Sequence, residues 1–279
     1  MQPAAVPVVA AVEEEALKSS RFAYLSDIHC PFVNHAAWAA ALGIVKSHRP
    51  DLVVIGGDLF ESGFASVHPN EYDHDGLDEY ESAATLLDTL RNACPKAKRV
   101  WLLGNHDDNI QKRDPRRVPK SLRRLVHWDN SKYSDSFKAW HQVPYVKSER
   151  GCYQLGQVIF KHGFSLNDEL EALQFSNYTG GFAHRLVIGG HTHAPTPPMP
   201  AMRTKKISLP LWYANAGTLC DIDKLEYMDR NDKWAWGAAV VLGDCDPSGP
   251  CLPGKCWEAE TRVLRMHSQW SPHSRPRRR

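Results

Sequence analysis

The most regular feature of the chain is a series of short apolar runs, each ending at a glycine or a polar cluster. Each run has the length and composition of a buried strand rather than of a helix. The runs are "RFAYLSD", "DLVVIGGD", "KRVWLLGNHD", "QVIFKHG" and "RLVIGGH", which begin at Arg21, Asp51, Lys98, Gln157 and Arg185. We therefore expect a buried strand in each of them.

Helical patterns separate the first three runs. "NHAAWAAALGIVKSHRP" begins with Asn34 as a helix cap and stops before Pro50, and "LDEYESAATLLDTLRNACP" repeats this arrangement and ends at Pro95. Alternation of strands and helices predicts parallel βαβ units. Further along, "LWYANAG" and "WAWGAAVVLG" have no helix between them, which predicts an antiparallel or mixed sheet. We expect the Pro-rich "APTPPMPAM" to be a loop near His191 and His193.

The regular pattern is interrupted from Asp108 to about Gly151, where the sequence is polar and basic and contains "RDPRRVPK". We expect a small helical, basic cap insertion at 108–151 within a domain that spans residues 21–265. Residues 1–20 are expected to form a flexible arm, and the basic end "SPHSRPRRR" a disordered tail over 266–279.

Composition narrows the class of protein. A chain of 279 residues with 42% hydrophobic and 24% charged residues is ordinary for a globular domain with a proper core. No apolar run approaches the roughly 18 residues of a membrane span, so we expect no membrane partner. The start of the chain lacks the features of a secretory signal, and seven scattered cysteines do not resemble a disulfide framework, which favours a cytoplasmic location. Whether Cys245, Cys251 and Cys256 are free or bind zinc is left open.

Candidate ligands for metal ions follow the predicted strands. Ligand crevices in α/β sheets lie at the carboxyl ends of the strands, so these side chains are expected to meet at one edge. They are Asp27 and His29 after the first strand, Asp58 after the second, Asn105, His106 and Asp107 after the third, His162 after the fourth, and His191 and His193 after the fifth.

The residue types indicate which ions would bind. Carboxylate, amide oxygen and imidazole without thiolate suit Mn²⁺, Fe²⁺ or Zn²⁺. These ligands are too many for one catalytic ion, and a carboxylate such as that of Asp58 can bridge two. Paired ions are the usual device for displacement at phosphorus. We expect Mn²⁺ in both positions, with Fe²⁺, Zn²⁺, Ni²⁺ and Co²⁺ as alternatives.

The ordered set D-x-H, G-D, G-N-H-D, H-G and G-H-x-H, from Asp27 to His193, resembles the motifs of the calcineurin-like metallophosphoesterases. The resemblance implies a four-layer α/β/β/α sandwich. It assigns one metal to Asp27, His29, Asp58 and His193, and the other to Asp58, Asn105, His162 and His191. His191 and His193 would therefore bind different ions.

The resemblance also implies that His106 protonates or steadies the leaving oxygen. We expect a hydroxide that bridges the two ions to attack phosphorus, while His106 donates a proton to the departing alkoxide. Asp107 either orients His106 or simply begins a helix.

Differences between this sequence and the motifs of individual subfamilies indicate which substrates to expect. "GDLFESG" lacks the Asp-Arg-Gly of protein Ser/Thr phosphatases and the tyrosine of purple acid phosphatases. "GDLF" is similar to DNA repair exonucleases and to lipid A precursor pyrophosphohydrolases, but the latter usually carry arginine at the position of His106. The basic segment from Lys112 to Arg124 follows the third motif directly, so we expect phosphate contacts from Arg113, Arg116, Arg117 and Arg203.

We therefore expect a phosphodiesterase that acts on nucleotides or nucleic acid. The alternatives are a phosphomonoesterase and a nucleotide-sugar pyrophosphohydrolase. A non-catalytic, metal-binding interaction scaffold is an alternative of another class, although such scaffolds generally lose the catalytic histidine or the ligands, and this chain keeps them.

Overall fold

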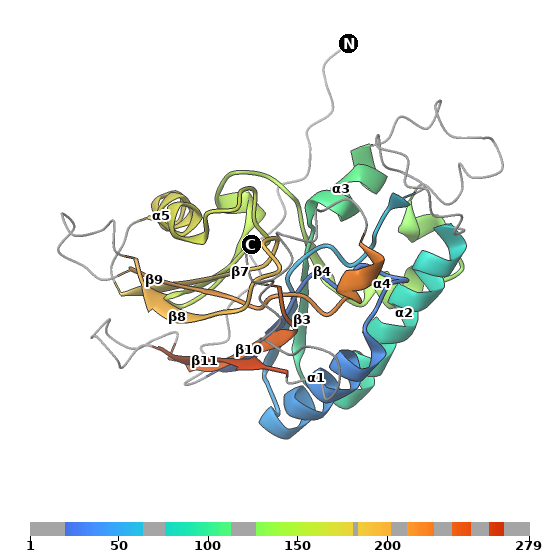
Figure 1. Ribbon diagram of the computed structural model, residues 1–279, viewed down its shortest axis with the longest axis horizontal. Coiled ribbons are helices and arrows are strands. Elements are labelled where there is room, and N and C mark those ends of the chain that lie inside the picture. Colours follow the sequence, from blue (N-terminus) through green and yellow to red (C-terminus); the bar gives the residue numbers. More distant parts are fainter. Residues whose placement is uncertain are drawn as a thin grey trace, which may run out of the picture.

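Two β-sheets stacked face to face occupy the centre of the molecule, with helices on both outer sides (Figure 1). The computed structural model describes residues 20–63, 76–112, 127–180, 184–201, 211–225, 236–246 and 257–264. The first sheet has the strand order β11-β10-β1-β2-β3-β4, and the second has the order β5-β6-β7-β9-β8.

The first sheet is parallel at its centre. Strands β1 to β4 run parallel to one another, while β10 is antiparallel to β1 and β11 is antiparallel to β10. Its strands are β1 (Ser20–Leu25), β2 (Leu52–Ile55), β3 (Lys98–Leu102), β4 (His141–Val143), β10 (Ala239–Cys245) and β11 (Trp257–Val263).

The second sheet is mixed, but the two runs expected to form such a sheet lie in different sheets, "LWYANAG" in β9 of the second and "WAWGAAVVLG" in β10 of the first. Strands β6, β7 and β9 are parallel, and β5 and β8 pair antiparallel with β6 and β9. Its strands are β5 (Tyr153–Leu155), β6 (Val158–Phe160), β7 (Arg185–Gly189), β8 (Thr196–Pro200) and β9 (Leu211–Asn215).

Helices cover the outer face of each sheet. Helix α1 begins after Asn34, whose side-chain oxygen accepts from the Ala37 amide, and it buries Trp38, Ala41 and Val45. The helices are α1 (His35–His48), α2 (Gly76–Ala93), α3 (Asn105–Lys112), α4 (Ser134–Lys138) and α5 (Asp168–Tyr178), with short 3-10 turns at Trp128–Asn130, Glu149–Gly151 and Ile222–Lys224.

The strands are apolar on both faces because both faces are covered. Along β1, Phe22 and Tyr24 point into the core between the sheets, whereas Ala23 and Leu25 point into the core beneath α1 and α2. A third core joins β6 and β7 to α5, where Val187 meets Phe175. These three cores separate four layers, so the expected α/β/β/α sandwich is confirmed.

The strands and helices predicted from the sequence are present. The five apolar runs correspond to β1, β2, β3, β6 and β7. The two helical patterns correspond to α1 and α2, which end before Pro50 and Pro95. None of the helices in the described residues is both long and apolar enough to cross a bilayer.

The segment expected to form a cap differs from that expectation over residues 127–151. Strand β4 extends the first sheet beside β3, and the aromatic rings of Trp128, Phe137 and Trp140 are buried in the core. Trp128 stacks on Phe60 with 5.6 Å between ring centroids. The average polarity of this segment concealed its buried part, because a few large aromatic side chains account for most of the buried area.

The Pro-rich segment is also not the loop that was expected. Its residues Thr196–Pro200 form β8, which pairs antiparallel with β9 and has an irregular register between Thr196 and Met199. Proline is tolerated there because β8 is an edge strand, where amides on one side need no partner.

Several expectations fall outside the described residues. These are the arm at 1–20 except Ser20, which belongs to β1, most of the basic segment after α3, the tail at 266–279, and Cys251 and Cys256. Cys245 lies within the described residues as a buried side chain whose Sγ donates to the carbonyl oxygen of Leu155.

The position of Phe137 makes the role of residues 127–151 testable. We expect Phe137→Ala to lower the free energy of unfolding by about 3 to 5 kcal/mol, because it empties a fully buried site. Lys138→Ala, at an exposed neighbouring position, should change it by less than about 0.5 kcal/mol. Urea unfolding followed by circular dichroism measures both, and equal effects would show that this segment is no part of the core.

Candidate metal centre

The polar residues that follow the strands meet at one edge of the two sheets. Asp27 and His29 follow β1, Asp58 follows β2, and Asn105 and His106 begin α3 directly after β3. The second sheet contributes His162 after β6, and His191 and His193 after β7. Each loop brings its side chains to the same place, which confirms that these residues converge.

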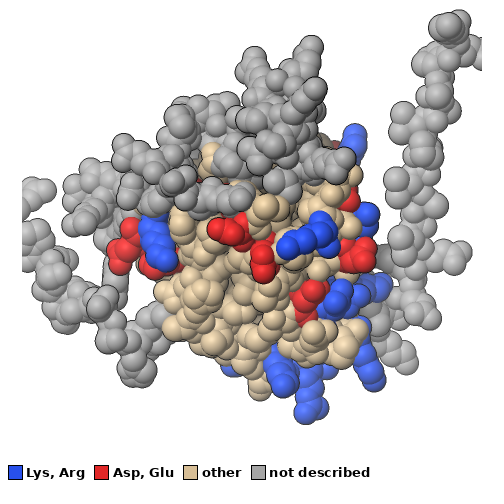
Figure 2. All heavy atoms as spheres, turned by 90° about the vertical axis from the view of Figure 1, so that its right-hand side faces the viewer, with Lys and Arg blue, Asp and Glu red and all other residues tan. Residues whose placement is uncertain are grey.

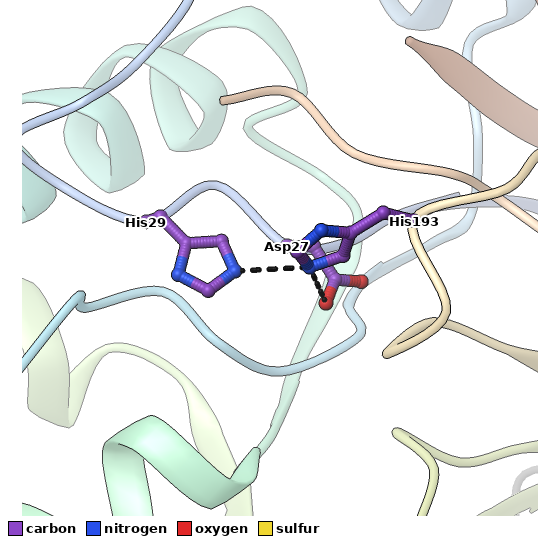
Figure 3. Close-up of side chains that lie close together, drawn as sticks. All are labelled: Asp27, His29 and His193. Atoms are coloured by element: carbon purple, nitrogen blue, oxygen red, sulfur yellow. Dashed lines mark hydrogen bonds and ion pairs between the residues drawn. The ribbon is translucent and has the colours of Figure 1, made fainter. Parts of the chain in front are cut away.

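One group of donor atoms consists of Asp27, His29 and His193, all buried (Figure 3). Nε2 of His193 lies 3.2 Å from Oδ1 of Asp27 and 3.2 Å from Nε2 of His29. Two imidazole nitrogens and a carboxylate oxygen thus face one another across a space that suits a cation.

A second group consists of Asp58, His162 and His191. Nε2 of His162 lies 3.3 Å from Oδ2 of Asp58 and 3.2 Å from Oδ1 of Asn105. The rings of His162 and His191 are 5.3 Å apart, measured between centroids. The amide oxygen of Asn105 therefore joins this group as a fourth donor.

Asp58 lies between the two groups. Its Oδ2 is 3.3 Å from Nε2 of His162 in the second group and 4.0 Å from Nε2 of His29 in the first. Its Oδ1 accepts a hydrogen bond from the backbone amide of His106, which fixes the orientation of the carboxylate. Asp58 is thus placed to contact an ion in either group.

The backbone is strained at many of these positions. Left-handed φ values at non-glycine residues are uncommon and cost of order 1 to 2 kcal/mol each. Among the described residues, such values occur at Asp27 (53°), His29 (51°), Asp58 (48°), His191 (74°) and His193 (58°). The fold holds these side chains in conformations that the backbone alone disfavours.

Two glycines allow the loops to come this close. A Cβ on Gly104 would lie 2.1 Å from Oδ1 of Asp58, and one on Gly190 would lie 2.4 Å from Oδ2 of Asp27. Any side chain would therefore displace a carboxylate of the centre, which explains glycine before the Asn105 and His191 motifs.

Burial and mutual contact shift the pKa values of the group. Burial alone would raise the pKa of Asp27, but the hydrogen bond and charge of His193, with the charge of His162, bring it to about 2. Burial alone would lower the pKa of His29, but the hydrogen bond and charge of Glu61 raise it to about 9. Burial would likewise lower the pKa of His162, but Asp58 raises it to about 9. Burial instead lowers the pKa of His191 to about 4 and also lowers that of His193, so positive charge in the centre is favoured on His29 and His162.

His106 lies beside the centre, with 20% of its side chain exposed. Its Nδ1 is 2.6 Å from the carbonyl oxygen of Glu61, an arrangement in which Nδ1 carries the proton and donates it. Its ring meets that of His29 edge-on, with centroids 4.8 Å apart. Proton exchange with a bound substrate would therefore use Nε2.

The carboxylate of Asp107 binds backbone amides of the loops rather than the ring of His106. Its Oδ1 accepts from the amides of Leu59 and Phe60, and its Oδ2 accepts from the amide of Gly104. The loop after β2 and the loop after β3 are thereby tied together. Burial, with the nearby charge of Asp58, raises the pKa of Asp107 to about 6.

Glu61 is a further residue of the centre, which the motifs in the sequence did not identify. Its Oε2 lies 2.7 Å from Nδ1 of His29, and the side chain is 1% exposed. A carboxylate behind a metal-ligating histidine fixes its tautomer and orientation. The acidic residue three positions after Asp58 in "GDLFE" was the available signal.

The donor set suits divalent ions. Carboxylate, amide and imidazole donors without thiolate match Mn²⁺, Fe²⁺ and Zn²⁺. Among the described residues, the buried Nδ1 of His193 has no hydrogen-bond partner, whereas its Nε2 faces Asp27 and His29. The predicted substrate contacts Arg113, Arg116, Arg117 and Arg203 lie outside the described residues.

Known proteins share features with this chain. No curated protein sequence matches it. Among solved structures, it is similar to YfcE, a phosphoesterase from E. coli, at 14% identity and a TM-score of 0.36, covering 82% of this chain and 93% of the other. It is similar to Vacuolar Protein Sorting 29 from Cryptosporidium parvum at 12% identity and a TM-score of 0.43, covering 88% and 98%.

The family of this chain is shown by its match to a protein-family profile. The profile described as calcineurin-like phosphoesterase matches residues 20–195, which contain all of the candidate ligands. The match covers more than half of the chain and begins and ends at the strands and loops that build the centre. The chain therefore belongs to the calcineurin-like phosphoesterase family.

Proposed function

We propose that this protein hydrolyses phosphodiesters of nucleotides or nucleic acid with two divalent metal ions. Family membership supports a phosphoric ester hydrolase. The observation that carries the proposal is the pair of donor groups that share Asp58, with His106 beside them. A single structural ion would need neither a second group nor an adjacent histidine.

Apart from the shared Asp58, the two groups would hold the two ions with different ligands. Asp27, His29 and His193 would hold the first, Asn105, His162 and His191 the second, and Asp58 would contact both. Divalent ions bound in this way lower the pKa of a water nucleophile and neutralise charge on a phosphoryl group. Mn²⁺ is our choice because the set mixes hard oxygen with imidazole donors.

His106 would supply the proton for the leaving group. The carbonyl of Glu61 holds Nδ1, so the ring is oriented before substrate arrives and Nε2 is the nitrogen that would face the leaving oxygen. A diester has an alkoxide leaving group of high basicity, for which protonation by a positioned histidine contributes about 10²- to 10⁴-fold.

Support for a nucleotide or nucleic acid substrate comes from the sequence. The basic segment between Lys112 and Arg124 directly follows α3, whose first residues belong to the metal centre. The described residues on the face seen in Figure 2 carry both signs of charge interspersed, without a basic stripe. The nucleic acid part of the proposal therefore rests on that segment.

The shared position of Asp58 gives the first test of the proposal. Asp58→Ala should remove both ions, whereas Asp135→Ala, at an exposed position on α4, should retain two per chain. Elemental analysis after loading with Mn²⁺ and desalting measures this, and circular dichroism verifies the fold. If the Asp58 variant keeps its full metal content, Asp58 is not a shared ligand.

The role of His106 is tested by separating metal binding from turnover. His106→Ala should keep its metal content but lose about 10²- to 10⁴-fold of turnover on a dinucleotide diester, whose leaving alkoxide is strongly basic, and much less on bis-p-nitrophenyl phosphate, whose leaving p-nitrophenolate is weakly basic. His35→Ala, which removes an exposed histidine from the start of α1, is the matched control. Unchanged turnover of the dinucleotide diester by the His106 variant would contradict its role as the acid.

The substrate class is tested by a panel assayed with Mn²⁺ at two salt concentrations. It includes cyclic nucleotides, single-stranded and duplex DNA, RNA, nucleotide sugars and a phosphomonoester. We expect hydrolysis of the diesters, and activity on polynucleotides that falls steeply with salt because phosphate contacts release counterions. Preference for the monoester would favour a phosphomonoesterase, and no hydrolysis at all would favour a binding scaffold.

A further inference from the structure

A buried polar network connects α5 to the loops of the second donor group. Asp168 and Glu171 lie three residues apart in the first turn of α5, so they share one face of the helix. Glu171 and its partner Lys161 are each 2% exposed although both are ionisable. Burying an ion pair is costly, so packing alone does not explain the network.

Glu171 holds the loop that carries His162. Its Oε2 lies 2.5 Å from Nζ of Lys161, and its Oε1 accepts from the amide of Phe164 at 2.5 Å. Lys161 precedes His162 and Phe164 follows it by two residues, so Glu171 binds the chain on both sides of this ligand. Charge from Lys161 and these hydrogen bonds lower the pKa of Glu171 despite its burial, which keeps it an anion.

Asp168 holds the loop that carries His191, through the fully buried Asn215. Nδ2 of Asn215 lies 3.2 and 3.3 Å from the two carboxylate oxygens of Asp168 and 2.9 Å from the carbonyl oxygen of Gly190. Oγ1 of Thr192 lies 2.9 Å from the same nitrogen and 3.5 Å from Oδ2 of Asp168. Gly190 and Thr192 flank His191, so this ligand is also held on both sides, and Thr192 directly precedes His193 of the first group.

The first donor group is held mainly by other contacts, although the carboxylate of Asp27 also accepts from the backbone amide of His191. The carbonyl oxygen of Asp27 accepts from Oγ1 of Thr218 and from the amide of Leu219, and His29 is oriented by Glu61. The carbonyl of His193 accepts from the amide of Gly237. In the described ranges, no hydrogen bond runs from α5 to Asp27, His29 or His193.

We propose that Asp168 and Glu171 of α5 are positioning residues that shape the second metal site, formed by Asn105, His162 and His191, and leave the first site largely independent of them. This inference rests on the proposed two-metal function. Its consequence is that damage to α5 reduces a dinuclear centre to a mononuclear one, with the ion kept between Asp27, His29 and His193.

The test compares Asp168→Ala with its isosteric counterpart Asp168→Asn. The alanine variant removes the acceptor for Asn215 and Thr192, whereas the asparagine variant keeps an oxygen in the same place. Asn177→Ala, at an exposed position of the same helix, is the control. Isothermal titration with Mn²⁺ measures the two affinities, and Mn²⁺ electron paramagnetic resonance distinguishes a coupled pair from an isolated ion.

We expect two Mn²⁺ sites and a coupled signal for the unaltered protein and for Asn177→Ala. Asp168→Ala should weaken one site about 10- to 100-fold and leave the other unchanged, and its spectrum should match that of a His162→Ala reference. Asp168→Asn should restore most of the lost affinity. Thr192→Val, which removes a single hydroxyl, should show the same selective loss on a smaller scale in a folded protein.

Equal weakening of both sites, or wild-type affinity at both sites in Asp168→Ala and Thr192→Val, would overturn the role of α5. Failure of the unaltered protein to bind two Mn²⁺ is a distinguishable result, because it would overturn the proposed function itself.

Discussion

The carboxylate of Asp58 is the constraint on which the rest of the centre depends. It is a buried anion, and its neighbours in the described part of the chain include imidazoles from both sheets and a backbone amide. A buried charge is costly unless opposite charge and hydrogen bonds surround it. The convergence of the loops around Asp58 meets that need, either with protons on His29 and His162 or with metal cations.

Holding so many polar groups at one edge requires support from the surrounding structure. Left-handed backbone at Asp27, Asp58 and His191 is unfavourable by itself and persists because neighbouring groups fix it. Asp107 ties two of the loops to each other, and the α5 network holds two more. The α/β/β/α layers therefore act as a rigid frame for a centre that is locally strained.

The convergence of the candidate ligands could be predicted because they stand directly after recognisable apolar strands. Parallel strands place their carboxyl ends together, so position along the chain was enough to bring Asp27, Asp58 and His162 to one edge. Glu61, Asn215 and Asp168 were not identified, because their roles depend on contacts between distant segments. The sequence predicted that Phe137 belongs to a cap, because the average polarity of residues 108–151 does not show that a few of their aromatic side chains are buried.

Hydrophobic periodicity and local turn chemistry act over a few residues, so the alternating strands and helices, the burial of the strands and the residue types of the centre could be inferred from the sequence alone. The tertiary structure decided which donors face each other, how Asp58 lies between the two groups, and which side chains stand behind them. Those features depend on distances between loops that are far apart in the chain. They are set only when both sheets pack face to face.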